Sequence, residues 1–259
     1  MEPLVSIITP AFNASNFIEK TIESVLCQTL ENWELLLIDD KSLDGTADIV
    51  EQYARSDRRI QLIRRGQNGG AAKARNDGMV RSQGRYVAML DSDDLWVPEK
   101  LEHQVSFMRQ RGAALSYTAY RRISYNGDRI GAVVGIPESL RYRQLLGHTA
   151  IANSTVIVDK QRVGKIRWTV GYGYEDLILW LGLLREGLVA YGLSEDLARL
   201  RIVPGSLSGD KLRSARWMWR IYREEEQLSI ARSLWYLASY GTRASLKRLG
   251  KHRPRTTAR

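Results

Sequence analysis

The chain has 259 residues, of which 44% are hydrophobic, and a formal net charge of +10 at pH 7. A chain of this length can bury a sizeable core, and we expect one α/β domain with an appendage. The single cysteine excludes an intramolecular disulfide, the N-terminal residues do not resemble a secretory signal, and no segment offers a long uninterrupted apolar span.

The first predicted strand covers residues 5–8 and ends in small and polar residues at 9–13. A helical pattern of apolar residues follows over 17–26. Cys27 falls on this apolar-rich helix, where we expect a small buried thiol in a reducing compartment.

The second predicted strand, residues 33–38, ends in the adjacent acids Asp39 and Asp40. Downstream, a pair of glycines permits close approach of the backbone to a ligand, and Lys73 and Arg75 then bring positive charge. This segment predicts an anionic ligand. The alternative is that both cations are solvated charges on a helix surface. Because the glycine patterns of dinucleotide sites and P-loops are absent, we predict neither.

The third predicted strand, residues 86–90, runs directly into Asp91, Asp93 and Asp94. Carboxylates at this spacing suit a divalent ion that keeps some waters and takes its other ligands from substrate phosphates. The alternative is a polar turn in which Asp94 is the N-cap of a helix that begins at Leu95.

Strand and helix patterns alternate over this part of the chain, which predicts right-handed βαβ units and a largely parallel sheet. Ligands of open α/β sheets bind outside the carboxyl ends of the strands. We therefore expect the three strand tips to meet at one crevice.

A loop that contains two glycines, residues 171–174, precedes Glu175 and Asp176, and an apolar helix follows over 177–181. The N-terminus of a helix favours a negative carboxylate. The sequence predicts that this loop delivers acids to the site. The alternative is that both acids only cap the helix.

The tail carries the excess of charge, because residues 199–259 hold 15 Lys and Arg against 4 Asp and Glu. A basic amphipathic helix is predicted, with arginines beside an apolar stripe. The arginines are Arg213, Arg216, Arg220 and Arg223, and the stripe is Leu212, Ala215, Trp219 and Tyr222.

Further aromatic and basic residues of the tail suit an anionic membrane surface. They are Trp217, Trp219, Trp235, Tyr236, Tyr240, Lys247, Arg248, Lys251, Arg253, Arg255 and Arg259. The alternatives are that the stripe packs on the body and leaves the arginines solvated, or that the tail binds nucleic acid.

In order and spacing, the motifs resemble those of the family 2 glycosyltransferases, the inverting group that uses nucleotide sugars. The motifs are Val5-Ser6-Ile7-Ile8-Thr9-Pro10-Ala11-Phe12-Asn13, Leu37-Ile38-Asp39-Asp40-Lys41-Ser42-Leu43-Asp44-Gly45-Thr46, Ala74-Arg75-Asn76, Asp91-Ser92-Asp93-Asp94-Leu95-Trp96-Val97-Pro98 and Glu175-Asp176. A weaker likeness, Arg201 and residues 204–212, is to bacterial members that build surface polysaccharides.

The resemblance implies a GT-A fold, an α/β architecture with a Rossmann-like, mostly parallel central sheet flanked by helices. The catalytic domain would span residues 1–205, with the nucleotide-sugar half at about 1–95 and the acceptor half at about 96–205. Residues 206–259 would form the helical basic tail.

By the same resemblance, the donor site would include Thr9, Pro10, Phe12, Asn13, Asp39, Asp40, Lys73, Arg75, Asn76, Asp91 and Ser92. Asp40 would accept a hydrogen bond from uracil N3, supported by Asp39. Asp93, with Asp91, would bind the Mg²⁺ or Mn²⁺ that bridges the diphosphate.

The resemblance also implies that Asp176 is the catalytic base. Candidates for contact with the acceptor are Glu175, His148, Asn153, Ser154 and Tyr172. The processive-synthase motif and its membrane spans are absent, so we expect one sugar to be added per encounter.

The expected function is transfer of one sugar from a nucleotide diphosphate sugar to a hydroxyl of a glycan or lipid-linked acceptor in bacterial surface-polysaccharide synthesis. Among the nucleotide sugars, a UDP-sugar is the expected donor. The expected location is the cytoplasm, at the inner face of the membrane. A nucleotidyltransferase is the first alternative, but it usually has a basic glycine-rich loop after the first strand. A nucleic-acid-binding protein is the second, but no recognised reading motif occurs, and we expect no such partner.

Overall fold

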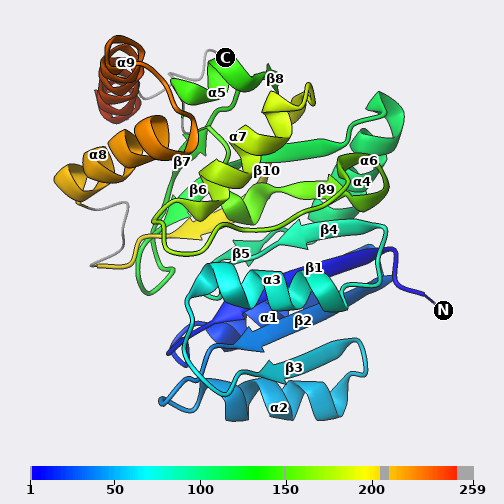
Figure 1. The fold of residues 1–259 in the computed structure, drawn as a ribbon. Helices are drawn as coiled ribbons and strands as arrows, with labels where there is room; N and C mark the ends of the chain where they lie inside the picture. Colours follow the sequence, from blue (N-terminus) through cyan, green and yellow to red (C-terminus); the bar gives the residue numbers. More distant parts are fainter. Residues whose placement is uncertain (1, 149, 205–209, 250–259) are drawn as a thin grey trace, which may run out of the picture.

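The structure is a computed structural model of the chain and describes residues 2–148, 150–204 and 210–249. These residues form a ten-stranded sheet with helices on both faces (Figure 1). The strands are β1 (Val5–Ala11), β2 (Trp33–Asp39), β3 (Ile60–Arg64), β4 (Tyr86–Met89), β5 (Leu95–Trp96), β6 (Leu115–Ile123), β7 (Ile130–Val134), β8 (Ser139–Leu140), β9 (Ile157–Asp159) and β10 (Ala190–Arg201).

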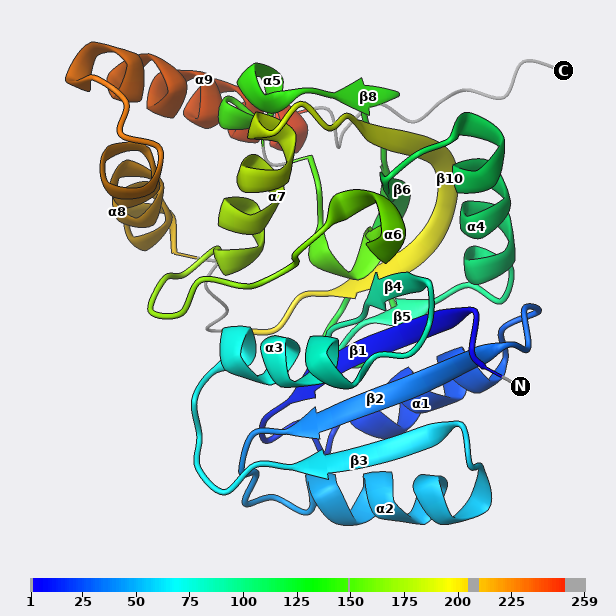
Figure 2. The same cartoon turned by 45° about the vertical axis from the view of Figure 1, so that its right-hand side comes forward.

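The strand order is β3-β2-β1-β4-β9-β6-β10-β5, with β7 paired to β6 and β8 paired to β10. The first four strands in this order are parallel, as the alternation of strands and helices predicts. Strand β9 is antiparallel to β4 and to β6, so the second half of the sheet is mixed. The arrowheads of β1, β2 and β3 point to the same edge (Figure 2), and Asp39 is the last residue of β2 at this edge.

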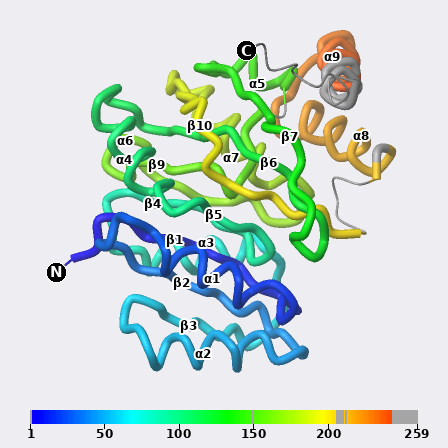
Figure 3. The backbone as a smooth tube through the Cα atoms, turned by 180° about the vertical axis from the view of Figure 1, so that it is seen from behind, coloured from blue at the N-terminus to red at the C-terminus, as the bar shows by residue number. Residues whose placement is uncertain are grey.

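Helices cover both faces of this sheet. They are α1 (Ile18–Leu26), α2 (Thr46–Ser56), α3 (Ala71–Arg81), α4 (Lys100–Arg111), α5 (Tyr142–Leu146), α6 (Lys160–Val163), α7 (Glu175–Arg185), α8 (Lys211–Arg220) and α9 (Ile230–Leu249). Helix α3 lies in front of β1 and β2 in Figure 1, and the view from behind in Figure 3 places α1 and α2 on the other face.

Each central strand contributes side chains to two separate cores, because successive residues of a strand point to opposite faces. Ile8 and Leu36 pack in the cluster that includes residues of α3 and α7. Ile7 and Leu35 pack in the cluster that includes residues of α1 and α4. Two buried faces explain why these strands read as continuous apolar runs.

The tail packs against the body of the protein. Helix α8, a π-helical turn (Ile221–Glu225) and α9 lie beside α5 and α7 (Figure 1). Met218, Ile221 and Tyr222 belong to the same core cluster as α7, and the Tyr222 hydroxyl donates to Leu146 O at 2.5 Å. The tail is therefore joined by a shared core to the part of the protein that contains α5 and α7.

The apolar stripe predicted for α8 coincides only partly with the face of the helix that is buried in the structure. Leu212 is 75% exposed and Trp219 is half-buried, whereas Met218 and Ile221 face the core. The buried face is offset by about one residue because Trp217 and Met218 pack toward α7 and its preceding loop. The side chains of Lys247 and Arg248, residues Lys251, Arg253, Arg255 and Arg259, and segment 205–209 lie outside the described part.

One local expectation, the buried Cys27, and one alternative, the Asp94 N-cap, were wrong. Cys27 is exposed, because it comes after the buried face of α1. Asp94 is not a helix N-cap, because Leu95 and Trp96 form strand β5 and the next helix begins at Lys100. Among the described residues, no helix combines the length and apolar character that a membrane span requires.

Candidate active site

A buried arginine on α3 joins two carboxylates that are far apart in the sequence. Arg75 Nη2 donates to Asp91 Oδ1 at 2.8 Å, and Arg75 Nη1 donates to Glu175 Oε1 at 2.7 Å. Burial alone would lower the pKa of Arg75, but the charges on Asp91 and Glu175 outweigh it and raise the pKa above its usual value. The tip of β4 and the start of α7 therefore meet at one point.

The acidic loop after β4 is held by a 3₁₀ turn, Asn153–Thr155. Asn153 Nδ2 donates to Asp91 Oδ1 at 2.8 Å, and Asp91 N–H donates to Ser154 Oγ at 3.0 Å. The Ser154 hydroxyl donates to Asp94 Oδ2 at 2.6 Å. Asn153 and Ser154, which the sequence assigned to the acceptor, thus support the acidic loop in this structure.

The acids of this loop are crowded. Burial raises the pKa of Asp93 to about 6, and the charge on Asp91 adds to the rise. Burial also raises the pKa of Asp94 well above its usual value. Arg201 supports the loop from β10, because its Nε donates to Asp93 O at 2.7 Å and its N–H donates to Asp94 Oδ1 at 2.8 Å. A cation would relieve the repulsion among these carboxylates.

A divalent ion fits this loop if the substrate supplies part of its coordination. Within the described residues, no group of three or more His, Cys, Asp or Glu side chains could hold a metal by itself. The same residues offer no hydrogen-bond partner to two buried atoms beside Asp91, namely Arg75 Nε and Asn153 Oδ1. Mg²⁺ commonly binds through one or two carboxylates plus phosphates and water, and Asp91 and Asp93 provide such a pair.

Asp176 is the second residue of α7 and follows a sharp turn of the backbone at Tyr174, whose φ is 66°. Burial raises the pKa of Asp176 to about 6; the charge on Glu175 adds to the rise and Arg75 opposes it. Asp176 therefore combines a raised pKa with a place next to the Arg75 ion pair, and its role as a general base stays a prediction.

Asp40 lies at the tip of β2, where it binds the turn before α3. Its carboxylate accepts hydrogen bonds from Gly69 N–H at 3.0 Å and Gly70 N–H at 2.7 Å, and it is ion-paired with Arg65. Only 3% of its side chain is exposed. Asp40 therefore fixes the glycine turn, and its contact with a uracil base stays a prediction.

The loops after β1 and β2 are tied together. Asn13, with φ 49°, accepts from Leu43 N–H at 2.9 Å through Oδ1, and its own N–H donates to Ser42 Oγ at 3.0 Å. The carboxylate of buried Asp39 accepts from Ser42 N–H at 3.3 Å. These contacts bring the first two strand tips together, and contact of Asn13 and Asp39 with a nucleotide stays a prediction.

The other residues predicted at the tip of β1 differ in exposure. Thr9 is fully buried, Pro10 is half-buried and Phe12 is 50% exposed. The ring of Phe12 is therefore the accessible apolar surface of this strand tip.

Of the residues predicted on α3, Lys73 is exposed and Arg75 lies at the junction. Asn76, predicted to face the donor, instead binds the main chain of Trp168 with both ends of its amide. Ser92 contributes its carbonyl, which accepts from Thr21 Oγ1 at 3.0 Å.

Two candidate acceptor residues lie farther along the chain. Tyr172 donates to Glu224 at 2.9 Å, and hydrogen bonds to Glu225 and Glu224 raise the pKa of its hydroxyl to about 12. His148 follows α5, and its N–H donates to Leu145 O at 2.9 Å. Their contact with an acceptor stays a prediction.

Sequence reasoning missed Arg65 and the role of α8. Arg65 directly follows β3, which was not identified as a strand from the sequence. If it had been, the expectation that strand tips meet at one edge would have placed Arg65 beside the acids. Helix α8 contacts the loop before α7, because Tyr174 and Ser214 hydroxyls lie 2.7 Å apart and Gly173 lies under the Trp217 ring. No local pattern signals such a contact.

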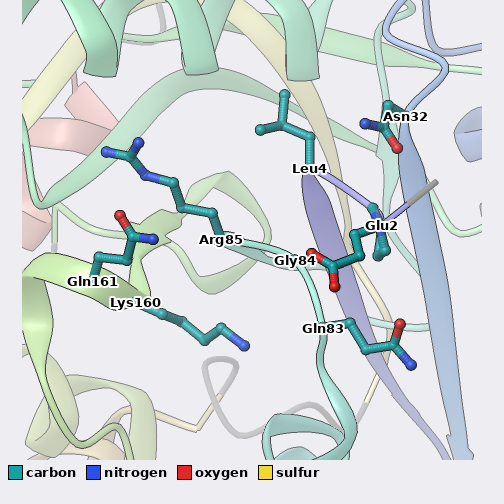
Figure 4. A pocket seen from close by; sticks show the side chains of 9 residues that line it. Glu2, Leu4, Asn32, Gln83, Gly84, Arg85, Lys160 and Gln161 are labelled. Atoms are coloured by element: carbon teal, nitrogen blue, oxygen red, sulfur yellow. The ribbon is translucent and has the colours of Figure 1, made fainter.

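A cavity of about 410 Å³ lies where β1 and β4 begin, opposite the edge that carries the acids (Figure 4). Its lining includes Arg85, which is ion-paired with Asp159, and Lys160, whose Nζ donates to Ser82 O at 2.7 Å. Because its cations are already engaged and parallel-sheet ligands bind at the carboxyl ends of strands, we do not assign the donor to it.

Comparison with known proteins gives a consistent result. A family model described as Glycosyl transferase family 2 matches residues 6–167. A Bacillus subtilis (strain 168) glycosyltransferase assigned to teichuronic acid biosynthesis, TuaG, is 43% identical over 248 residues, 96% of this chain and 98% of that protein. An Escherichia coli protein, the UDP-Glc:alpha-D-GlcNAc-diphosphoundecaprenol beta-1,3-glucosyltransferase WfgD, is 35% identical over 238 residues, 92% of each chain.

Solved structures share the fold. S. aureus TarS 1–349 in complex with UDP-GlcNAc aligns with a TM-score of 0.69 and 19% identity, over 93% of this chain and 71% of that one. This chain covers 43% of a longer TarS chain. The mannosyltransferase PcManGT from Pyrobaculum calidifontis, in complex with GDP-Man and Mn²⁺, aligns with a TM-score of 0.70 and 16% identity, over 95% of this chain and 74% of that one.

Proposed function

The chain belongs to glycosyl transferase family 2, and from this membership we propose that it transfers one sugar from a nucleotide diphosphate sugar to a hydroxyl of a glycan or lipid-linked acceptor, with inversion. It is a transferase enzyme with the GT-A fold. The observation that carries the proposal is the Arg75 junction, because it joins the acid after β4 to the acid beside Asp176.

In this proposal, Asp176 removes the proton from the acceptor hydroxyl. The acceptor oxygen forms a bond to the anomeric carbon on the face opposite the nucleotide, while the bond from that carbon to the diphosphate oxygen breaks. The nucleoside diphosphate leaves with the electron pair of that bond. The raised pKa of Asp176 supports this role, because a base works best when its pKa lies near the working pH.

The charge that develops on the leaving diphosphate requires stabilisation. A divalent ion held by Asp91 and Asp93 would supply electrostatic stabilisation of this charge. Arg75 assists from the protein side, since its guanidinium is buried at the same carboxylate. Bound Mn²⁺ in a neighbour of the same fold is consistent with this assignment.

We propose UDP as the nucleotide and a surface polysaccharide as the product class. Support comes from the relatives, since one is assigned to teichuronic acid biosynthesis and another is named for UDP-Glc and a diphosphoundecaprenol-linked acceptor. The donor contacts predicted for the β1 and β2 tips belong to this proposal. Of these, the exposed ring of Phe12 is placed to contact a base.

We further propose that the tail holds the enzyme at the cytoplasmic face of an anionic membrane. Support comes from exposed apolar side chains beside exposed arginines on α8 and α9. The apolar residues are Leu212, Ile230, Leu234 and Trp235, and the arginines are Arg213, Arg216 and Arg232. No observation favours a nucleotidyltransferase or a nucleic-acid partner.

The test uses the full chain with UDP-, GDP- and dTDP-sugars, Mg²⁺ or Mn²⁺ and a lipid-linked glycan, and it measures nucleoside diphosphate release. We expect one UDP-sugar to be turned over, and Asp176→Asn to reduce turnover by about 10²- to 10⁴-fold while UDP affinity is retained. The matched control is Asp48→Asn on α2, whose carboxylate is 78% exposed. Full turnover by Asp176→Asn would remove the base assignment, and no release from any nucleotide sugar would refute the function.

A further inference from the structure

Asn76, next to Arg75, was expected to contact the donor, but its side chain binds the main chain of Trp168 instead. Its Oδ1 accepts from Trp168 N–H at 2.8 Å, and its Nδ2 donates to Trp168 O at 2.9 Å. The two residues are 92 positions apart in the sequence. One amide side chain therefore satisfies both main-chain groups of a residue in the other half of the protein.

Helix α3 gives Asn76 a fixed position relative to the donor half. The helix packs closely on the sheet at Gly78, where an added Cβ would lie 2.7 Å from Ile8 and 2.8 Å from Ile38. On the same helix, Arg75 contacts Asp91. Asn76 is thus attached to the same rigid element that supports the acidic loop.

Trp168 is the anchor of the loop that ends at the base. It is 1% exposed and packs in the core cluster that contains the apolar residues of α7. From Trp168 the chain runs through Gly171, with φ 95°, and Tyr174, with φ 66°, to Asp176. Irregular backbone of this kind takes its position from its attachments, because no helix or strand ladder fixes it.

Contacts with other elements hold this loop at its start, at its end and between these points. Asn76 holds its start through Trp168, and Arg75 holds its end through Glu175. Between these points, helix α8 contacts the loop at Gly173 and at Tyr174. Of these, Asn76 is the attachment that ties the start of the loop to the donor half.

We propose that Asn76 is a positioning residue that sets where Asp176 stands relative to the donor sugar. The proposal rests on the function proposed above. It replaces the donor contact expected from the sequence, because both ends of the amide are engaged by Trp168. Reaction rates are sensitive to such placement, since a displacement of about 1 Å can cost about 10²-fold in rate.

The experiment compares the wild type with Asn76→Ala and Asn76→Asp, and it uses Gln52→Ala on the exposed face of α2 as the matched control. Asn76→Asp keeps an acceptor for Trp168 N–H but removes the donor to Trp168 O, so it tests the contact if the alanine variant does not fold. Three quantities are measured: kcat, UDP affinity with metal by calorimetry, and amide hydrogen exchange over residues 168–175.

We expect kcat to fall by about 10- to 100-fold in both variants while UDP affinity changes by less than about twofold. Exchange should accelerate at the Trp168 amide and over residues 168–175, but not in β1 or β2. A general loss of structure would accelerate exchange throughout, so the local pattern identifies a positioning role. The Gln52→Ala control should match the wild type in all three quantities.

Two results would overturn the proposal: kcat within about twofold of the wild type, or a loss of UDP affinity that accounts for the loss of rate. The second would make Asn76 a donor ligand. If the wild type turns over no nucleotide sugar, the proposed function fails. Hydrogen exchange then decides the attachment by itself, since unchanged exchange over residues 168–175 would refute it.

Discussion

Asp93 and Asp176 have pKa values raised to about 6, and in both groups burial is the largest cause. Their neighbours differ. Asp93 lies in a loop of three acids, where the charge on Asp91 adds to the rise and Arg201 opposes it. Asp176 lies one residue from Glu175, which already has Arg75 as a partner. The same shift therefore suits one carboxylate to metal binding and the other to proton transfer.

The raised pKa of Asp176 predicts how the rate depends on pH. The base must be ionised, so kcat should be constant above about pH 7 and fall about tenfold for each pH unit below about 6. The measurement is kcat under saturating donor, acceptor and metal from pH 5 to 8. A rate that stays constant down to pH 5 would show that a group with an ordinary carboxyl pKa controls the reaction.

The same shift makes a prediction about stability. A carboxyl whose pKa is raised by folding holds its proton more tightly in the folded state, so its contribution to the free energy of unfolding falls as pH rises from 3.8 to about 6. Asp176→Asn removes this loss of stability. At pH 7 the variant should melt at an equal or higher temperature than the wild type. At pH 4, where the loss is largely absent, no such gain is expected. A lower melting temperature at pH 7 would mean that Asp176 stabilises the fold.

Asp93→Ala tests the metal assignment. Loss of this carboxylate should weaken UDP binding in the presence of Mn²⁺ and leave the weaker metal-free binding nearly unchanged. Calorimetry with and without Mn²⁺ measures both affinities. Equal metal-dependent affinity in the variant and the wild type would exclude Asp93 as a ligand.

At the scale of single residues, the sequence identified the acids but not their partners. Asp91 and Asp93 follow a strand tip, and Asp176 lies in the first turn of α7, so a local pattern marks each of them. The partners of Asp91 come from elsewhere: Asn153 is 62 positions away. Side-chain contacts over such separations depend on the packing of whole elements, which no local pattern contains.

At the scale of elements, the loop before α7 takes its shape from two neighbouring helices, α3 and α8, rather than from its own sequence. Its glycines indicate an irregular turn, but the helix was expected from residue 177, whereas α7 begins at Glu175. The packing of this loop between α3 and α8 was not predictable, because it depends on the indole of Trp217 lying against Gly173. Strand β5 is similar: its pairing with β10 overrides the helix start that the sequence suggested.

Gly173→Ala tests the contact between this loop and Trp217 of α8. The added Cβ would lie 2.9 Å from Trp217 Nε1, so α8 or the loop must shift. We expect kcat to fall by about 10- to 100-fold and the free energy of unfolding to fall by about 1–3 kcal/mol. Gly182→Ala is the matched control within α7, because nothing lies within 4 Å of its added Cβ. Equal kinetics in the two variants would show that the loop does not depend on this contact.

At the scale of the whole molecule, the two halves differ in how far the sequence predicts them. The parallel arrangement of β1, β2 and β4 follows from alternating strands and helices and the handedness of their connections, whereas β3 was not identified from the sequence. The second half pairs strands such as β9 and β4, whose residues are far apart in the sequence and antiparallel. Its arrangement, and the burial of α8 in its core, arise from long-range packing.

The charge of the whole molecule predicts its behaviour at membranes. The full chain should co-float with vesicles that contain anionic lipid at low salt and be released at high salt. Replacing Arg213, Arg216 and Arg232 with Gln should weaken binding by about 100-fold, at about 1 kcal/mol for each charge. Trp235→Ala should also weaken it, whereas Val80→Ala, an equally exposed change on α3, should not. If the wild type floated with neutral vesicles but not with vesicles that contain anionic lipid, the membrane assignment would be contradicted.

The contact between α8 and the loop before α7 also bears on the order in which the protein is made. The ribosome completes all ten strands of the sheet before it synthesises Trp217. The acidic loop and the glycine turn therefore lie in the part of the chain that is translated before α8. In the proposal made above, the position of Asp176 depends in addition on contacts with a helix that is translated after the sheet.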